Sequence, residues 1–295
     1  MFDNFGLILA KLYGMYSNMF LIMAGLAVLF TLIAIFTNQA CNPERRWWQS
    51  PELPTDICYA LGTTLILPYL SFPAAVLVHL SLCGFMTTPE IEAYFQEGHG
   101  PLAGLGFWWQ VPIHLVLSDF LAYWLHRGFH GATMWRFHAI HHSATDVDWH
   151  TTYRMHPVNH ALSPQLVTVT MLTLGISPQV PAFLIAWEIL SAAFVHANLN
   201  WTFGPLKYVI AGPVFHRWHH GPADDGGAMN FASTFSFIDW VFGTFHMPEG
   251  RLPMKFGVDD PNFPKTYLGQ LLYPFKPQAQ PEATSTAPVQ GNPVA

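Results

Sequence analysis

Charged side chains are scarce in this sequence of 295 residues. Asp, Glu, Lys and Arg together make up 10% of it, whereas soluble domains carry about 25%. Hydrophobic residues make up 51%, and the mean hydropathy is +0.26, which is positive but not extreme. The composition predicts a protein with several membrane segments and a substantial part outside the membrane.

Basic residues and cysteines are also few. The 12 Lys and Arg residues are scattered and the formal net charge is −6, whereas nucleic-acid binding needs clustered positive charge. We therefore expect no nucleic acid among the partners. Only Cys41, Cys58 and Cys83 are present, and none forms a CxxC pair. This count excludes a disulfide framework and argues against a thiolate zinc or iron–sulfur site.

Long apolar segments indicate an all-α fold. Residues 19–37 contain no charge and are long enough to span a bilayer, and Arg45 and Arg46 follow the run, unlike in a signal peptide. Further apolar segments are expected at residues 57–85 (kinked by Pro68 and Pro73), 107–125, 161–176 and 180–195. We predict an integral-membrane helical bundle with about four to five spanning or re-entrant helices.

The distribution of Lys and Arg predicts the orientation, because cytoplasmic loops are enriched in these residues. Arg45 and Arg46 place the loop after the first span inside, and residues 83–106, with no Lys or Arg, lie outside. In this topology eleven of the 12 basic residues are cytoplasmic, with Lys11 the exception. The third span returns to the cytoplasm at residue 126, the 161–195 hairpin enters the membrane and comes back, and the chain from residue 198 onward is cytoplasmic. The histidine boxes then lie in a cytoplasmic, histidine-rich cap on a multi-pass membrane protein.

Histidine is abundant, with 16 residues, and eight of them lie in two short windows. His126 and His130 are spaced i, i+4, which places both imidazoles on one face of a helix. Two triplets share the spacing i, i+3, i+4, namely His138, His141, His142 and His216, His219, His220. Neutral imidazole is a ligand for zinc, copper, iron and nickel, so the pattern predicts a metal centre.

Eight ligands are too many for one ion, so we expect two ions. A single histidine of this kind could be an ordinary surface or core residue. Eight clustered rings in the cationic form would repel one another, and a bound metal removes this repulsion because it requires the neutral form. His196 and Asn200, spaced i, i+4 at the end of the 161–195 hairpin, are expected to return to the same face. We predict His196 as a ninth histidine ligand and Asn200 as a tentative tenth, with a helix cap as its alternative role.

These boxes and their flanks resemble the fatty acid hydroxylase/sterol desaturase superfamily, whose members carry HxxxH, HxxHH and HxxHH boxes. The matching segments are Asp119-x3-Tyr123-x2-His126-Arg127-x2-His130, His138-Ala-Ile-His141-His142-Ser143, Tyr153-Arg154-Met155-His156-Pro157, Asn230-Phe231 and Asp239-Trp240-x-Phe242-Gly243-Thr244. The resemblance covers roughly residues 107–246. It is specific for the superfamily and does not identify a subfamily.

The resemblance implies a membrane enzyme with two non-haem iron ions that uses O2 as co-substrate and two electrons to oxidise a lipid. Hydroxylation of a lipid or sterol C–H bond is the leading hypothesis, and desaturation and ether-lipid oxidation are its rivals within the superfamily. Iron can activate O2, whereas zinc has no redox chemistry, although zinc could occupy the site in purified protein.

Carboxylates are expected behind the ligands, because a metal-bound histidine usually donates its other N–H to a carboxylate or carbonyl. Asp119 lies seven residues before His126 within an apolar span, and a membrane carboxylate is functional by default. A polar contact between helices is the alternative role. We predict Asp119 and Asp239 as tentative partners of this kind, with Glu188, Asp146 and Asp148 as weaker candidates. His79, His99 and His114 are not expected to be ligands.

The sequence contains no recognisable electron-transfer module, so electrons are expected from a separate ferredoxin, cytochrome b5 or flavoprotein reductase. Two hypotheses from another class stay open, a metal transporter and a non-redox zinc protein. A transporter would place its ligands near mid-bilayer, and here they gather at one end. We divide the chain into an N-terminal membrane region (1–106), a catalytic domain (107–250), an extension (251–275) and a disordered tail (276–295).

Overall fold

The computed structural model describes residues 2–62, 65 and 100–276. All regular structure in these residues is helical, which confirms the predicted all-α class. The α-helices are α1 (Phe2–Thr37), α4 (Phe107–Phe129), α5 (Trp135–His142), α6 (Pro157–Leu174), α7 (Gln179–His196), α8 (Pro213–His219), α9 (Phe237–Val241) and α10 (Tyr267–Leu272). Short 3-10 helices are η1 (Trp47–Gln49), η2 (Trp149–Tyr153), η3 (Gly204–Tyr208), η4 (Ala223–Asp225) and η5 (Tyr273–Phe275), and residues 53–62 are also helical.

Proline and glycine define the ends of the helices nearest the site. Pro157 begins α6 and Pro213 begins α8, positions where the missing N–H has no partner in the helix anyway. Gly175 ends α6 in the left-handed conformation, with φ of 87°. A Cβ atom there would lie 2.8 Å from the Ala103 nitrogen, so the tight turn into α7 requires glycine.

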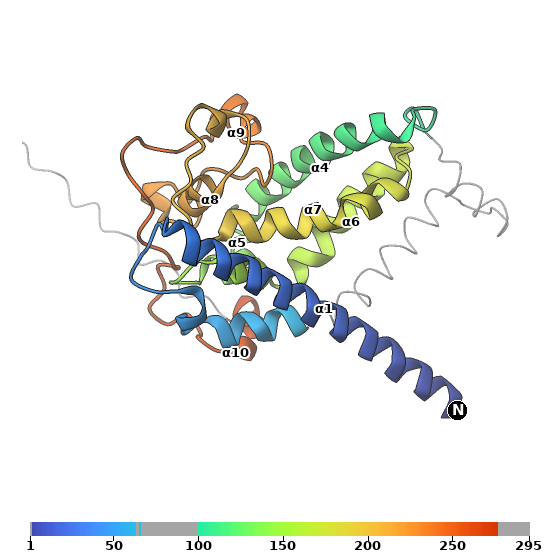
Figure 1. Ribbon diagram of the computed structural model, residues 1–295, viewed down its shortest axis with the longest axis horizontal. Coiled ribbons are helices and arrows are strands. Elements are labelled where there is room, and N and C mark those ends of the chain that lie inside the picture. The colour runs from blue at the N-terminus through green and yellow to red at the C-terminus, as the bar shows by residue number, and fades with distance from the viewer. Residues whose placement is uncertain (1, 63–64, 66–99, 277–295) are drawn as a thin grey trace, which may run out of the picture.

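The long helices α4, α6 and α7 extend away from the short helices α5, α8 and α9, which gather at one end (Figure 1). Helix α4 packs against both α6 and α7. An apolar cluster around Met171, Val180 and Leu184 joins the three helices. Helix α1 joins this body through Leu26 and Phe30, which pack in one cluster with Trp149. The histidine-bearing ends of the elements therefore meet where the long helices end.

Two described helical segments are long and apolar enough to cross a membrane, Ser17–Thr37 with a mean hydropathy of 2.7 and Gln179–His196 with 1.4. They correspond to the expected segments at 19–37 and 180–195 and indicate a membrane protein. The expected segments at 107–125 and 161–176 are helical as well, as α4 and α6. Most of the expected 57–85 segment, His79, His99 and the tail after residue 276 lie outside the described residues. The number of spans, the cytoplasmic cap and the domain boundaries stay predictions.

Candidate metal centre

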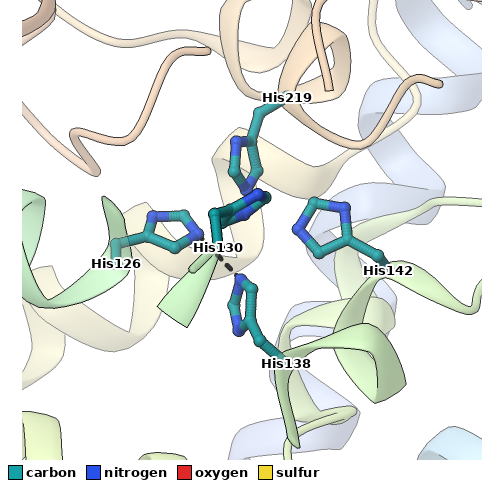
Figure 2. Close-up of side chains that lie close together, drawn as sticks. All are labelled: His126, His130, His138, His142 and His219. Atoms are coloured by element: carbon teal, nitrogen blue, oxygen red, sulfur yellow. Dashed lines mark hydrogen bonds between the residues drawn. The ribbon is translucent and has the colours of Figure 1, made fainter. Parts of the chain in front are cut away.

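Nine histidines gather into two groups, and they are the nine that the sequence predicts as ligands. The ring nitrogens within each group lie within 4.8 Å of one another. The first group, which Figure 2 shows with its rings facing one another, is His126, His130, His138, His142 and His219. The second group is His141, His196, His216 and His220. Helices α4, α5, α7 and α8 supply these residues, with His130 and His220 as the C-caps of α4 and α8.

Each triplet contributes to both groups, a division that spacing alone did not predict. In α5 the i, i+4 pair His138 and His142 joins the first group, and His141 joins the second. In α8 the arrangement is reversed, because His216 and His220 join the second group and His219 the first. The two groups are therefore interlocked, and rings from different groups contact each other, such as His142 and His220 with centroids 4.7 Å apart.

The nitrogen positions of the second group fit a cation between its rings. His141 Nδ1 lies 3.1 Å from the Arg154 carbonyl oxygen and His196 Nδ1 lies 2.7 Å from that of Ala192. A carbonyl oxygen only accepts, so both Nδ1 atoms carry the proton, and a neutral ring then has a lone pair on Nε2. The two Nε2 atoms nevertheless lie 3.1 Å apart, and His216 Nε2 lies 3.0 Å from that of His196. Two lone pairs at this distance repel unless a positive ion lies between them.

The first group follows the same rule. His126 Nδ1 donates to the Phe231 carbonyl oxygen at 2.8 Å, and His219 Nδ1 donates to that of Met229 at 2.7 Å. His126 Nε2 therefore faces the group as a lone pair, 3.0 Å from His138 Nε2. On its other side, His138 Nδ1 lies 3.2 Å from the Asn159 amide nitrogen, which is a donor, whereas the buried Asn159 Oδ1 has no hydrogen-bond partner among the described residues. If His138 Nε2 is to bind an ion, the Asn159 amide must present its oxygen here to accept the Nδ1 proton. Imidazole nitrogens bound about 2.0–2.1 Å from one ion approach each other to about this distance.

Several buried ring nitrogens lack a hydrogen-bond partner among the described residues. They are Nε2 of His130, His142 and His219, Nδ1 of His216 and both nitrogens of His220. A buried polar atom left unpaired costs about 1–3 kcal/mol, so a site with this many orphaned nitrogens is unfavourable as an ordinary core. A metal ion in each group would give one nitrogen of each ring a partner, including Nε2 of His130, His142 and His219, and the residues present fit two ions.

Burial keeps the rings in the form that binds metal. Six of these histidines have a pKa well below the ordinary value. Desolvation lowers the pKa most, and repulsion between neighbouring imidazoles lowers it further. The six residues are His138, His141, His142, His216, His219 and His220. These rings are therefore neutral at pH 7, and their lone pairs are available to an ion.

Asp119 and Asp239 do not touch the imidazoles, although the sequence predicted them as direct partners. Asp119 accepts hydrogen bonds from the backbone N–H groups of residues 233–235, at 2.6–3.2 Å. Asp239 accepts from the N–H groups of Phe231 and Ala232 at 2.7 and 2.8 Å, and from the Thr244 hydroxyl at 2.7 Å. Both carboxylates hold the 231–235 segment, whose Phe231 carbonyl positions His126. That the two carboxylates support the centre stays a prediction, and any such support would be transmitted through the backbone of this segment.

The contacts of Asn200 and Glu188 lie away from the histidine rings that the sequence predicted as their neighbours. Helix α7 ends at His196, so Asn200 does not share a helix face with it, and the Asn200 N–H bonds to the Gln39 carbonyl oxygen at 3.0 Å. Asn200 as a ligand stays a prediction. Glu188 lies 3.8 Å from His114, in the long-helix region. His114 is outside both groups, as expected.

A buried charged cluster behind His141 escaped sequence reasoning. Arg154, 1% exposed, forms ion pairs with Asp56 (2.5 Å) and with Glu52, and Asp56 also bonds His150 Nδ1 at 2.5 Å. Because the Arg154 carbonyl accepts the His141 proton, the N-terminal residues Glu52 and Asp56 brace the metal centre. The sequence features that could have indicated this cluster are the Tyr153–Pro157 motif and the two acids Glu52 and Asp56.

The centre opens into a cavity of about 610 Å³ between α4, α6 and α7. Its lining includes His126, His138, His141, His196 and His216 at one end and apolar side chains such as Val167, Met171 and Ile176 along its length. This volume lies in the range of small-molecule sites. The geometry defines a class of membrane protein in which a histidine-rich candidate metal centre faces an apolar cavity.

Comparison with known proteins agrees with this class. Residues 111–244 match the family model described as fatty acid hydroxylase. The resemblance read from the histidine boxes is therefore confirmed over this part of the chain.

Relatives differ in how much of their length the chain matches. Ornithine lipid hydroxylase OlsE of Rhizobium tropici is 28% identical over 286 residues, 92% of this chain and 81% of that protein. Alkylglycerol monooxygenase of Xenopus tropicalis is 32% identical, over 52% of this chain and 33% of that protein. Methylsterol monooxygenase 1-1 of Arabidopsis thaliana is 26% identical, over 46% of each. No solved structure matches the chain. The comparisons support an oxidoreductase of the hydroxylase and monooxygenase class.

Proposed function

We propose that the protein is a membrane oxidase that holds two non-haem iron ions and uses O2 to hydroxylate a C–H bond of a lipid. The observation that carries the proposal is the convergence of nine neutral imidazoles on two points at the end of an apolar cavity. Zinc and iron both accept nitrogen ligands, but only iron supplies the redox chemistry that insertion of oxygen requires.

In this proposal the nine histidines hold the two ions, five around one and four around the other. When bound, the irons supply O2 activation. The chain's own residues keep the rings in place, because the carbonyl oxygens of Phe231, Met229 and Arg154 each accept an Nδ1 proton and fix the Nε2 lone pair toward the centre. Asp119 and Asp239 hold the segment that carries the first of these carbonyls.

The cavity binds the lipid and keeps water from the reacting carbon. Its wall between α4, α6 and α7 is largely apolar, which suits an alkyl chain. The cavity's end among His126, His138 and His141 brings one carbon of that chain beside the centre. Which carbon reacts follows from how the rest of the lipid is anchored.

Hydroxylation is the reaction we favour over desaturation and ether cleavage, since the relative matched over most of its length is an ornithine lipid hydroxylase. An amino-acid-containing lipid is therefore the first substrate class to test. Alkyl ethers and methylsterols follow, after the substrates named in the alkylglycerol and methylsterol monooxygenases. Electrons would come from a separate donor on the cytoplasmic face, a ferredoxin, cytochrome b5 or flavoprotein reductase.

Lipidomics of cells with and without the protein tests the reaction. We expect lipids heavier by 16 mass units in cells that make the wild type, and none in cells that make His219→Ala. A loss of 2 mass units would indicate desaturation. The surface variant Glu249→Gln is the control, because this side chain is 92% exposed and lies outside the cavity.

Metal analysis tests the cofactor separately. Protein purified anaerobically from iron-supplied cells is expected to contain two iron ions per chain. Two zinc ions and no iron, with no O2-dependent product, would contradict the oxidase proposal and favour a non-redox zinc protein.

A further inference from the structure

One polar pair in the cavity has no part in the metal centre. His114 of α4 and Glu188 of α7 both line the cavity, and His114 Nε2 lies 3.8 Å from a Glu188 carboxylate oxygen. His114 is 3% exposed, and its Nδ1 has no hydrogen-bond partner among the described residues. The Glu188 side chain is 51% exposed and is turned toward the cavity. A buried unpaired nitrogen beside a carboxylate, in an apolar wall, indicates a binding role.

The pair lies far from the candidate irons. Twelve residues of α4 separate His114 from His126, and eight residues of α7 separate Glu188 from His196. At 1.5 Å per residue these separations correspond to about 18 Å and about 12 Å along the two helices. The pair is therefore beyond contact with the metal ligands and can touch only a remote part of a bound lipid.

Glu188 has no Lys or Arg partner among the described residues. The described residues that line the cavity include no Lys or Arg. Asp119, another carboxylate of the lining, is already engaged by the backbone N–H groups of residues 233–235. The sequence itself has no Lys or Arg between Arg46 and Arg127, so no segment in that interval can supply one. A carboxylate in a membrane-length helix is costly without a cation, and a ligand can supply that cation.

We propose that Glu188 and His114 form a headgroup subsite that binds an ammonium group of the lipid substrate, with its chain extending along the cavity toward the metal centre. The proposal rests on the proposed function, because it takes the bound lipid to be the substrate. Binding of the ammonium group itself does not depend on turnover. An ammonium donates hydrogen bonds to the Glu188 carboxylate, and the His114 ring, as an acceptor, can take another. The oxidised carbon then lies on the chain, about 12–18 Å from the nitrogen, because the helix separations set that distance.

Two lipids that differ only in the polar group test the subsite. Iron-loaded, full-length protein in nanodiscs is given hexadecylamine or 1-hexadecanol, with a ferredoxin and its reductase as surrogate donor. Wild type is expected to favour the amine in kcat/KM. Glu188→Gln should reduce that preference roughly tenfold, mainly by raising KM for the amine, with a much smaller change in kcat/KM for the alcohol. Glu249→Gln, which removes an exposed carboxylate outside the cavity, should leave the preference unchanged.

Other outcomes would overturn the subsite. An equal loss on both lipids in Glu188→Gln would mean that the pair is only a contact between α4 and α7. A wild-type preference for the alcohol would mean that the pair binds a neutral hydroxyl. Oxidation at the carbon next to the nitrogen would contradict the predicted distance.

A binding measurement separates this proposal from the proposed function. If no lipid is oxidised although both irons are bound, the oxidase proposal fails, and the subsite is still tested by equilibrium binding of radiolabelled hexadecylamine to the same nanodiscs. Wild type should bind it roughly tenfold more tightly than Glu188→Gln, and equal affinities would refute the ammonium subsite.

Discussion

The buried ion pairs of Arg154 offer a matched test of how the N-terminal region braces the metal centre. Arg154→Met removes the cation that neutralises Asp56, which is 0% exposed, and Glu52, whose side chain is 16% exposed. Removing one partner of a buried pair costs about 3–5 kcal/mol, because the other charge stays buried and unpaired. Methionine keeps most of the volume, so lost packing contributes little of this cost.

Arg251→Met is the control, since it removes the same chemical group from a solvent-exposed pair. Arg251 bonds Asp225 at 2.8 Å, but the side chains are 57% and 42% exposed. An exposed pair contributes about 0–1 kcal/mol, and the contact of the guanidinium with the Trp218 ring adds a similar amount at most. The two variants differ mainly in burial.

The assay is the rate of irreversible unfolding in detergent, followed by circular dichroism, together with the iron content of each variant. We expect Arg154→Met to unfold much faster and to lose iron, because the Arg154 carbonyl no longer holds the His141 ring rigidly. Arg251→Met should resemble the wild type. Equal stability and equal iron content in the two variants would refute the view that residues 52–56 brace the centre.

Three further predictions concern the centre and its surroundings. His141→Ala and His219→Ala should each lower bound iron and abolish oxidation, although they remove ligands from different groups; full metal content in either would remove that residue from the site. Asn159→Leu should weaken Fe(II) affinity about 10- to 100-fold, measured by competition with a chelator, because His138 Nδ1 loses the amide whose unpaired oxygen can accept its proton when Nε2 binds the ion. Burial alone lowers the pKa of His150, but the hydrogen bond and charge of Asp56 outweigh it and raise that pKa. The stability from this pair is therefore fully present below about pH 6.5 and is lost as pH rises through the folded-state pKa; unfolding rates should increase over that interval in the wild type and be less pH-dependent in His150→Gln.

The sequence predicted which histidines meet, because i, i+4 and i, i+3 spacing on a helix is a local property. It could not predict how they divide. His141 meets His196 of α7 and His138 meets His126 of α4 because of how α5 packs against α4 and α6, and that packing is set by residues distant in sequence. His196 was found only because the hairpin formed by the segments 161–176 and 180–195 returns to the same end of the molecule.

The partners behind the rings were harder to predict. Met229 and Phe231 lie in a stretch without regular structure, and their side chains give no indication that their carbonyl oxygens accept protons from His219 and His126. Reasoning from residue types assigned this task to Asp119 and Asp239, the acids nearest the boxes. In the structure those acids bind backbone N–H groups of residues 231–235 instead of the rings.

The absence of a carboxylate among the proposed ligands affects the charge balance of the centre. All nine ligands are neutral, so oxidation of a bound iron would add positive charge to a buried site with no ligand carboxylate to balance it. Asp239 accepts the N–H of Ala232, which belongs to the same peptide group as the Phe231 carbonyl, and that carbonyl accepts the N–H of His126. Hydrogen bonds in such a chain polarise one another, so the carboxylate makes the His126 ring a stronger donor without occupying a coordination position. In the proposed oxidase this chain of hydrogen bonds would balance part of the added charge without a carboxylate ligand.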